Sequence, residues 1–265
     1  TAYNGNAGGD SDASIKNLDA YQSGFEDGGA AGTVGAWTAK YPGAIGNSLK
    51  VSVCASSDAY YNDNVTTTSA LEAAGQTVIS VTAETGFGVR DIVRFGSATQ
   101  EYRVTATATG TITVEALNQP AGTGLVAQVA SGTQVHRYWE FYNQFDKAPG
   151  TSASATAASG SADEIHVVVV DEDGVISGKQ HEVLETYGFV SCASDSKDAS
   201  GSSNYYKTKI NNQSDWIWWT GHSTSTHPAA NSVHTHALSG STAFGRPSAP
   251  INSSLADGAD GADVS

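Results

Sequence analysis

The clearest apolar pattern in the chain is the run of residues 164–170, Glu-Ile-His-Val-Val-Val-Val. An uninterrupted β-branched run of this length predicts a strand that is buried on both faces. Asp173 and Gly174 follow, and this pair predicts a tight reversal because both residues tolerate positive φ. The chain would then return through residues 175–177 and pair back along 183–184. We therefore expect an antiparallel strand pair at the centre of the fold.

Shorter patterns around this pair predict further elements of the same domain. Residues 202–210 begin with serine as an N-cap and carry Tyr206 and Ile210 one helical turn apart, which predicts a short helix. A strand at 215–219 closes this unit. Upstream, the alternation of residues 49–54 predicts a half-buried strand. Helices and strands in this mixture indicate the α+β class.

The middle of the chain has a different texture. Short β-rich runs follow one another at nearly even spacing, with glycine-containing turns between them, at 77–81, 92–95, 101–106 and 111–115. Even spacing of short strands is typical of a small sandwich or barrel, and the Ser, Ala and Gly stretch after it has linker composition. We therefore predict an inserted all-β surface module at 71–149 and a discontinuous mixed α/β core domain made of 1–70 and 150–265.

Composition excludes several classes of function. The formal net charge is −14 and the pI is about 4.7, so nucleic acid, which is bound through clustered Lys and Arg, is not an expected partner. No apolar run approaches the roughly 20 residues that span a bilayer, and the amino terminus lacks the layout of a signal peptide, so membrane insertion is not expected. The chain has no methionine, from which we expect it to be a piece of a longer polypeptide.

Histidines supply the most tempting candidate for a metal site. His222, His227, His234 and His236 lie within fifteen positions, and imidazole is a common ligand of transition metals. Their segment has no framing carboxylate and no metalloprotease spacing, so polar loop histidines are the favoured interpretation and a metal-dependent hydrolase is the enzyme alternative. His166, flanked by apolar residues, is interpreted as a packed or edge histidine.

No other pattern points to catalysis. The chain has neither a Gly-x-Ser-x-Gly elbow nor a phosphate-binding glycine loop with its lysine, so we expect no catalytic residue, no cofactor and no enzymatic activity. Cys54 and Cys192 could form at most one disulfide and are interpreted as buried free thiols. Trp216, Trp218 and Trp219 could stack on a sugar, but core packing is the favoured interpretation.

Four segments of the chain, taken together, match the motifs of one family. The first is 37–51, Trp-Thr-Ala-Lys-Tyr-Pro-Gly-Ala-Ile-Gly-Asn-Ser-Leu-Lys-Val. The others are the strand, Asp-Gly turn and strand of 165–187, the stretch 203–218, and 255–261, Leu-Ala-Asp-Gly-Ala-Asp-Gly, in which Asp257 stands where the motif usually has glycine. In this order, the segments resemble the tail sheath proteins of contractile-tailed bacteriophages.

The resemblance implies a structural role. The chain would be a middle, outward-facing portion of a subunit that self-associates in rings around an inner tube, within a virion tail assembled in the host bacterial cytoplasm. Repacking of such a lattice on contraction drives the tube through the host envelope. The inner tube and the baseplate would be contacted through regions absent from this chain. The alternative is a virion surface adhesin or carbohydrate-binding decoration, carried by the tryptophan strand and the β module.

Overall fold

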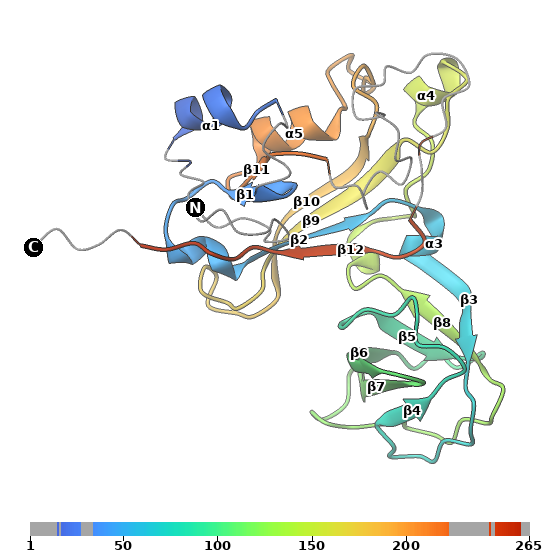
Figure 1. Cartoon of the computed structure of the whole chain (residues 1–265). Helices are drawn as coiled ribbons and strands as arrows, with labels where there is room; N and C mark the ends of the chain where they lie inside the picture. The colour runs from blue at the N-terminus through green and yellow to red at the C-terminus, as the bar shows by residue number, and fades with distance from the viewer. Residues whose placement is uncertain (1–14, 16, 28–33, 223–243, 245–246, 261–265) are drawn as a thin grey trace, which may run out of the picture. The chain divides into compact units, whose positions relative to one another are not determined.

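The structure is a computed structural model that describes residues 15, 17–27, 34–222, 244 and 247–260. Short helices accompany several antiparallel sheets, which confirms the predicted α+β class (Figure 1). The chain divides into two compact units. Unit 1 comprises Thr1–Ala55, Pro149–Pro247 and Ile251–Ser265, and unit 2 comprises Ser56–Ala148 with Ser248–Pro250.

A four-stranded antiparallel sheet forms the centre of unit 1. Its strand order is β10 (Glu182–Ser191), β9 (Glu164–Asp171), β2 (Leu49–Cys54) and β12 (Ile251–Ser254). Every residue of β9 after the first is buried, as the β-branched run predicts. The prediction that β2 is half-buried is wrong, because β2 pairs with β9 on one side and β12 on the other and all of its residues are buried.

The predicted tight reversal after β9 is also wrong. Val183 of β10 pairs with Val170 as expected, but the chain reverses through the whole loop 172–181, and residues 175–177 lie in this loop rather than in a returning strand. Gly174 does adopt positive φ, +79°, and a Cβ there would lie 2.8 Å from the backbone nitrogen of Gln180. Glycine is therefore needed at position 174 because the backbone of Gln180 approaches it closely, within a loop that is longer than a two-residue turn.

The rest of unit 1 packs beside this sheet. Helix α5 (Tyr206–Gln213) begins later than predicted, with Tyr205 rather than a serine at its N-cap, and it buries Tyr206 and Ile210 as the pattern indicates. Strand β11 (Ile217–Trp219) follows α5 and pairs antiparallel with β1 (Trp37–Ala39). Helices α1 (Leu18–Gly24) and α4 (Ala153–Ala157) and the 3-10 helix η1 (Ala44–Ser48) complete the unit.

Unit 2 has a separate antiparallel sheet and a separate core. The short helices α3 (Ser57–Tyr60) and η2 (Tyr142–Gln144) flank six strands in the order β3 (Tyr61–Thr67), β8 (Gln134–Tyr138), β5 (Ile92–Phe95), β6 (Tyr102–Ala108), β7 (Thr111–Ala116) and β4 (Val78–Ser80). The two ends of this order meet, because Thr68 forms an antiparallel bridge with Val81 and the amide of Ser69 donates to the carbonyl of Ser80. The sheet thereby curls on itself around a core that includes Val93, Val104 and Val135.

A buried arginine ties unit 2 together. Arg137 is only 1% exposed, and its guanidinium donates to the carbonyl oxygens of Gly86 at 3.0 Å and Ser248 at 2.8 Å, and also to that of Asp58. Backbone carbonyls therefore accept hydrogen bonds from the buried cation, as a buried polar group requires. The contact with Ser248 joins the short segment Ser248–Pro250 to this unit.

Candidate functional site

The segments that carry the family resemblance all lie in unit 1 and contact one another through paired strands. Strand β1 from segment 37–51 pairs with β11, whose residues Ile217 and Trp218 belong to segment 203–218. Strand β2 from the same first segment pairs with β9 from segment 165–187. Segments that are far apart in the sequence therefore share one packed core.

Side-chain contacts join the fourth segment, 255–261, to the first. Asn47 donates its Nδ2 to the carbonyl of Gly258 at 2.9 Å and accepts the Gly258 amide on Oδ1 at 2.7 Å. The Ala44 amide donates to Oδ1 of Asp260 at 2.8 Å, and a Cβ at Gly43 would lie 2.5 Å from that same oxygen. Gly43 is thus required both by its φ of +104° and by the close approach of Asp260.

Asp171 organises the loop between β9 and β10. Its side chain accepts hydrogen bonds from the Ser48 hydroxyl at 2.6 Å, from the amides of Gly174 and Ile176 at 3.0 Å each, and from the amide and hydroxyl of Ser177. Burial alone would raise the pKa of the Asp171 carboxyl, but these donors outweigh it, and the pKa lies below its usual range. The ionised carboxylate fixes the shape of the loop.

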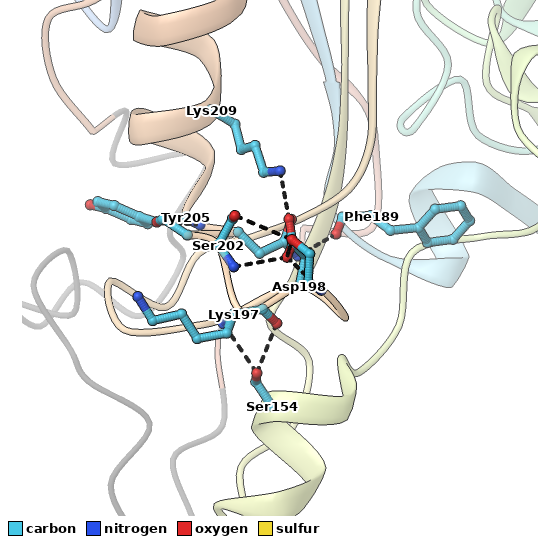
Figure 2. Close-up of polar contacts among 10 residues, drawn as sticks. Ser154, Phe189, Lys197, Asp198, Ser202, Tyr205 and Lys209 are labelled. Carbon is cyan, nitrogen blue, oxygen red and sulfur yellow. Dashed lines mark hydrogen bonds and ion pairs between the residues drawn. The ribbon is translucent and has the colours of Figure 1, made fainter.

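Asp198 plays the same part in the loop before α5 (Figure 2). Its carboxylate accepts hydrogen bonds from the backbone amides of Ser200 and Ser202 at 3.0 Å each and from Nζ of Lys209 on α5 at 2.9 Å. The bond from the Ser200 hydroxyl lowers the pKa of Asp198 most, and the bonds from Lys209 and the two amides lower it further, to well below its usual range. Ser154 of α4 fastens the same loop by bonding both to the amide and to the carbonyl of Lys197. The Ser202 amide is thus part of the loop that Asp198 organises, and the helix begins only at Tyr206.

Of the four candidate histidines, only His222 lies within the described residues, and His227, His234 and His236 lie outside them. His222 faces two tyrosines, with Nδ1 bonded to the Tyr206 hydroxyl and Nε2 lying 3.3 Å from the Tyr205 hydroxyl. Across the described part of the chain, no group of three or more His, Cys, Asp or Glu side chains is placed to hold a metal ion.

The tryptophans in and beside strand β11 pack against other residues of unit 1 rather than forming a flat aromatic pair. Trp219 is buried. The Trp218 ring stacks on Tyr21 with 4.4 Å between ring centroids, and Nζ of Lys40 lies 3.9 Å from the Trp218 centroid. Trp216 is half-buried and packs against the core of unit 1. Tyr21 and Lys40 thus cover part of the Trp218 ring, which fits packing within unit 1.

The remaining reactive side chains of the described residues, Cys54, Cys192 and His166, are buried in unit 1. Cys54 and Cys192 are buried free thiols, as predicted, and burial raises the pKa of the Cys192 thiol, which keeps it protonated. His166 is fully buried, and its Nδ1 accepts the Phe189 amide at 3.1 Å. This bond fits the predicted packed histidine.

Among the described residues, none of the helices has the length and apolar character of a membrane span.

A groove that the sequence interpretation missed lies on unit 2. It has a volume of about 460 Å³ and is lined by Tyr61, Arg94, Gly96, Ser97, Ala98, Thr99, Gln134, His136 and Tyr138. The signal for it was present in 134–138, where polar and aromatic side chains alternate with buried Val135 and Arg137. That segment escaped prediction because an arginine among its inward-facing positions hides the apolar alternation of a strand.

Comparison with family models, with curated proteins and with solved structures finds no match to this chain.

Proposed function

We propose that this chain is part of a structural subunit of a contractile viral tail sheath. One observation carries the proposal: the four segments that resemble sheath proteins, separated in the sequence, pack together in unit 1. Their packing means that the matched motifs belong to one folded unit. The proposal rests on the motifs and their packing.

Local geometry supports the resemblance at its glycine positions. The motif usually has glycine where this chain has Asp257, and Asp257 adopts a φ of +61°, in the left-handed region that favours glycine. Gly43, from the Pro-Gly step of the first segment, also requires positive φ. The backbone thus keeps the conformation that the motif implies, including at the position where the residue departs from it.

The proposed work is mechanical and uses surfaces rather than covalent chemistry. Subunits would self-associate in rings around an inner tube in the virion tail, which would be assembled in the host bacterial cytoplasm. A switch to a shorter packing would drive the tube through the host envelope, and the tube and the baseplate would be contacted through regions absent from this chain. Unit 2 would supply the inserted surface module of the subunit.

Exposed apolar side chains of the first segment are candidates for the subunit contact. Tyr41 is 51% exposed and Ile45 is 41% exposed, and both lie beside the turn that Asp260 supports. Large apolar side chains that stay in water within a short segment commonly mark an interaction surface. We therefore assign these two residues to contacts between neighbouring subunits.

The double substitution Tyr41→Ser and Ile45→Ser tests this assignment in the native polypeptide that carries the chain. We expect the unaltered protein to sediment as large helical assemblies and the double variant to remain small, with the same circular dichroism spectrum. Val78→Ser, which alters a 46% exposed side chain of unit 2, is the matched control and should assemble normally. Normal assembly of the double variant would show that these side chains are not the contact.

A further inference from the structure

The outer face of the sheet in unit 2 gathers polar and aromatic side chains from three neighbouring strands. Tyr61 of β3 is the cross-strand partner of Tyr138 in β8, and Arg94 of β5 is the partner of His136 in β8. Because side chains alternate along a strand, these four share one face, while Val135 and its neighbours point into the core. The groove of about 460 Å³ lies on this face.

The aromatic side chains of this face are held in a fixed arrangement. The Tyr61 and Tyr138 ring centroids are 4.6 Å apart, and the Tyr61 and His136 centroids are 6.4 Å apart with an interplanar angle of 23°. The Arg94 guanidinium carbon lies 4.7 Å from the Tyr138 centroid, and its NH1 donates to the Tyr138 hydroxyl at 3.1 Å. A surface fixed by packing loses little conformational entropy when a ligand binds.

Charge within the groove is balanced. The Arg94 guanidinium forms an ion pair with Glu101, and the Tyr142 hydroxyl also donates to Glu101. Burial, followed by the nearby Glu101 carboxylate, raises the pKa of Tyr142 to about 12, so this hydroxyl stays neutral. A paired arginine in a chain of net charge −14 does not favour an anionic ligand. The face therefore suits an uncharged molecule.

Two polar atoms of the groove residues still lack a partner. Nε of Arg94 and Nδ1 of His136 are buried and form no hydrogen bond with any described residue. Buried polar atoms are seldom left unpaired in folded proteins, and both of these belong to residues that line the groove. The Gln134 side chain and the Ser97 and Thr99 hydroxyls add further donors and acceptors to the groove.

We propose that this groove binds a neutral saccharide, with Tyr61 as the stacking platform. Tyr61 is 38% exposed, so part of its ring is available to the apolar C–H face of a sugar ring, and the amide, hydroxyl and guanidinium groups around it match the sugar hydroxyls. The groove volume falls within the roughly 300–1,000 Å³ of small-ligand sites. This binding role goes beyond the proposed assembly role and does not depend on it.

Binding of the purified chain to an array of glucose-, galactose- and N-acetylhexosamine-terminated oligosaccharides tests the proposal. We expect at least one of these neutral glycans to bind, and Tyr61→Ala to weaken that binding at least tenfold. Gln134→Ala, a second groove variant at an exposed position, should weaken it several-fold and keeps the test valid if Tyr61→Ala fails to fold. Leu71→Ala, at a 62% exposed position of unit 2 that does not line the groove, should bind as the unaltered chain does.

Three results would overturn the proposal. The first is no binding to any neutral glycan of the array. The second is binding that neither groove variant weakens, and the third is binding confined to sulfated or sialylated glycans or to nucleic acid on the same array. Because the array uses the isolated chain and assembly is followed by sedimentation, a failure of the saccharide site is distinguishable from a failure of the sheath role.

Discussion

At the residue scale, backbone conformation explains two positions at the junction of segments 37–51 and 255–261. Gly43 has a φ of +104° and leaves room for Asp260, whose carboxylate accepts the Ala44 amide. Asp257 has a φ of +61°, which Asp adopts more readily than a bulky residue does. Both positions allow the chain to turn at the place where the side-chain amide of Asn47 bonds to the backbone of Gly258.

Substitutions at Asp257 should therefore follow backbone preference rather than side-chain contacts. The residue is exposed, so its side chain has little packing to lose. We expect Asp257→Gly to leave the free energy of unfolding unchanged or raise it by up to about 1 kcal/mol, and Asp257→Val to lower it by about 1–2 kcal/mol. Urea denaturation measures both changes. Equal stability of the glycine and valine variants would contradict the positive φ at this position.

At the element scale, buried carboxylates at the two ends of β9 accept hydrogen bonds that hold the adjoining loops of unit 1 in place. Asp171 at the end of β9 collects the donors of loop 172–181, and Asp163 before β9 accepts both the amide and the hydroxyl of Ser152 and the hydroxyl of Ser191. Through these bonds, Asp163 joins α4 to the end of β10. The strands are thus bounded by buried acceptors as well as by turn-forming residues.

Removing the charge of Asp171 should loosen this loop. We expect Asp171→Asn to lower the free energy of unfolding by about 2–3 kcal/mol, because an amide accepts fewer of the backbone donors and presents its own N–H groups to them. Asp173→Asn, at an exposed position of the same loop, is the matched control and should change little. Urea denaturation at pH 7 separates the two variants.

The pH dependence of unit 1 should follow from the same carboxylate. The pKa of Asp171 is lower in the folded chain than in the unfolded chain, so its contribution to stability is present above its unfolded pKa of about 4 and is lost as the pH falls through the folded value. We expect the stability difference between the unaltered protein and Asp171→Asn to shrink below pH 4. A difference that is constant from pH 7 to pH 3 would show that ionisation of Asp171 does not support the loop.

The sequence predicts strands better than it predicts the connections between them. The run in β9 is long and β-branched, so its existence and burial follow from composition alone. The loop 172–181 does not, because Asp171 organises it through amides that any residue could supply. The start of α5 is missed because the loop before it continues to Tyr205, with the amides of Ser200 and Ser202 bonded to Asp198. The groove depends on Tyr61, which is distant in sequence from Tyr138, and no local pattern joins them.

At the scale of the whole molecule, the two hydrophobic cores are built from different parts of the chain. The core of unit 1 includes Val167 and Ile210, whereas that of unit 2 includes Val104 and Val135. Compact units with separate cores commonly unfold in separate steps. The described structure therefore predicts more than one cooperative transition.

Calorimetry of matched core variants tests this prediction. Val167→Ala and Val135→Ala each remove two methyl groups from a fully buried position, which should cost about 2 kcal/mol and lower a melting temperature by several degrees. We expect each variant to shift a different one of two transitions. A single transition that both variants shift equally would show that the two cores unfold as one unit.

The measurement that tests the sheath proposal most directly is electron microscopy of native particles with gold-labelled antibodies raised against this chain. Helical averaging of the labelled particles gives the arrangement of the subunits. We predict gold along a tail of stacked rings that surround an inner tube, and a shorter, wider tail carrying the same label after contraction. Label on monomers, or on a shell or fibre without an inner tube, would contradict the assignment to a contractile sheath.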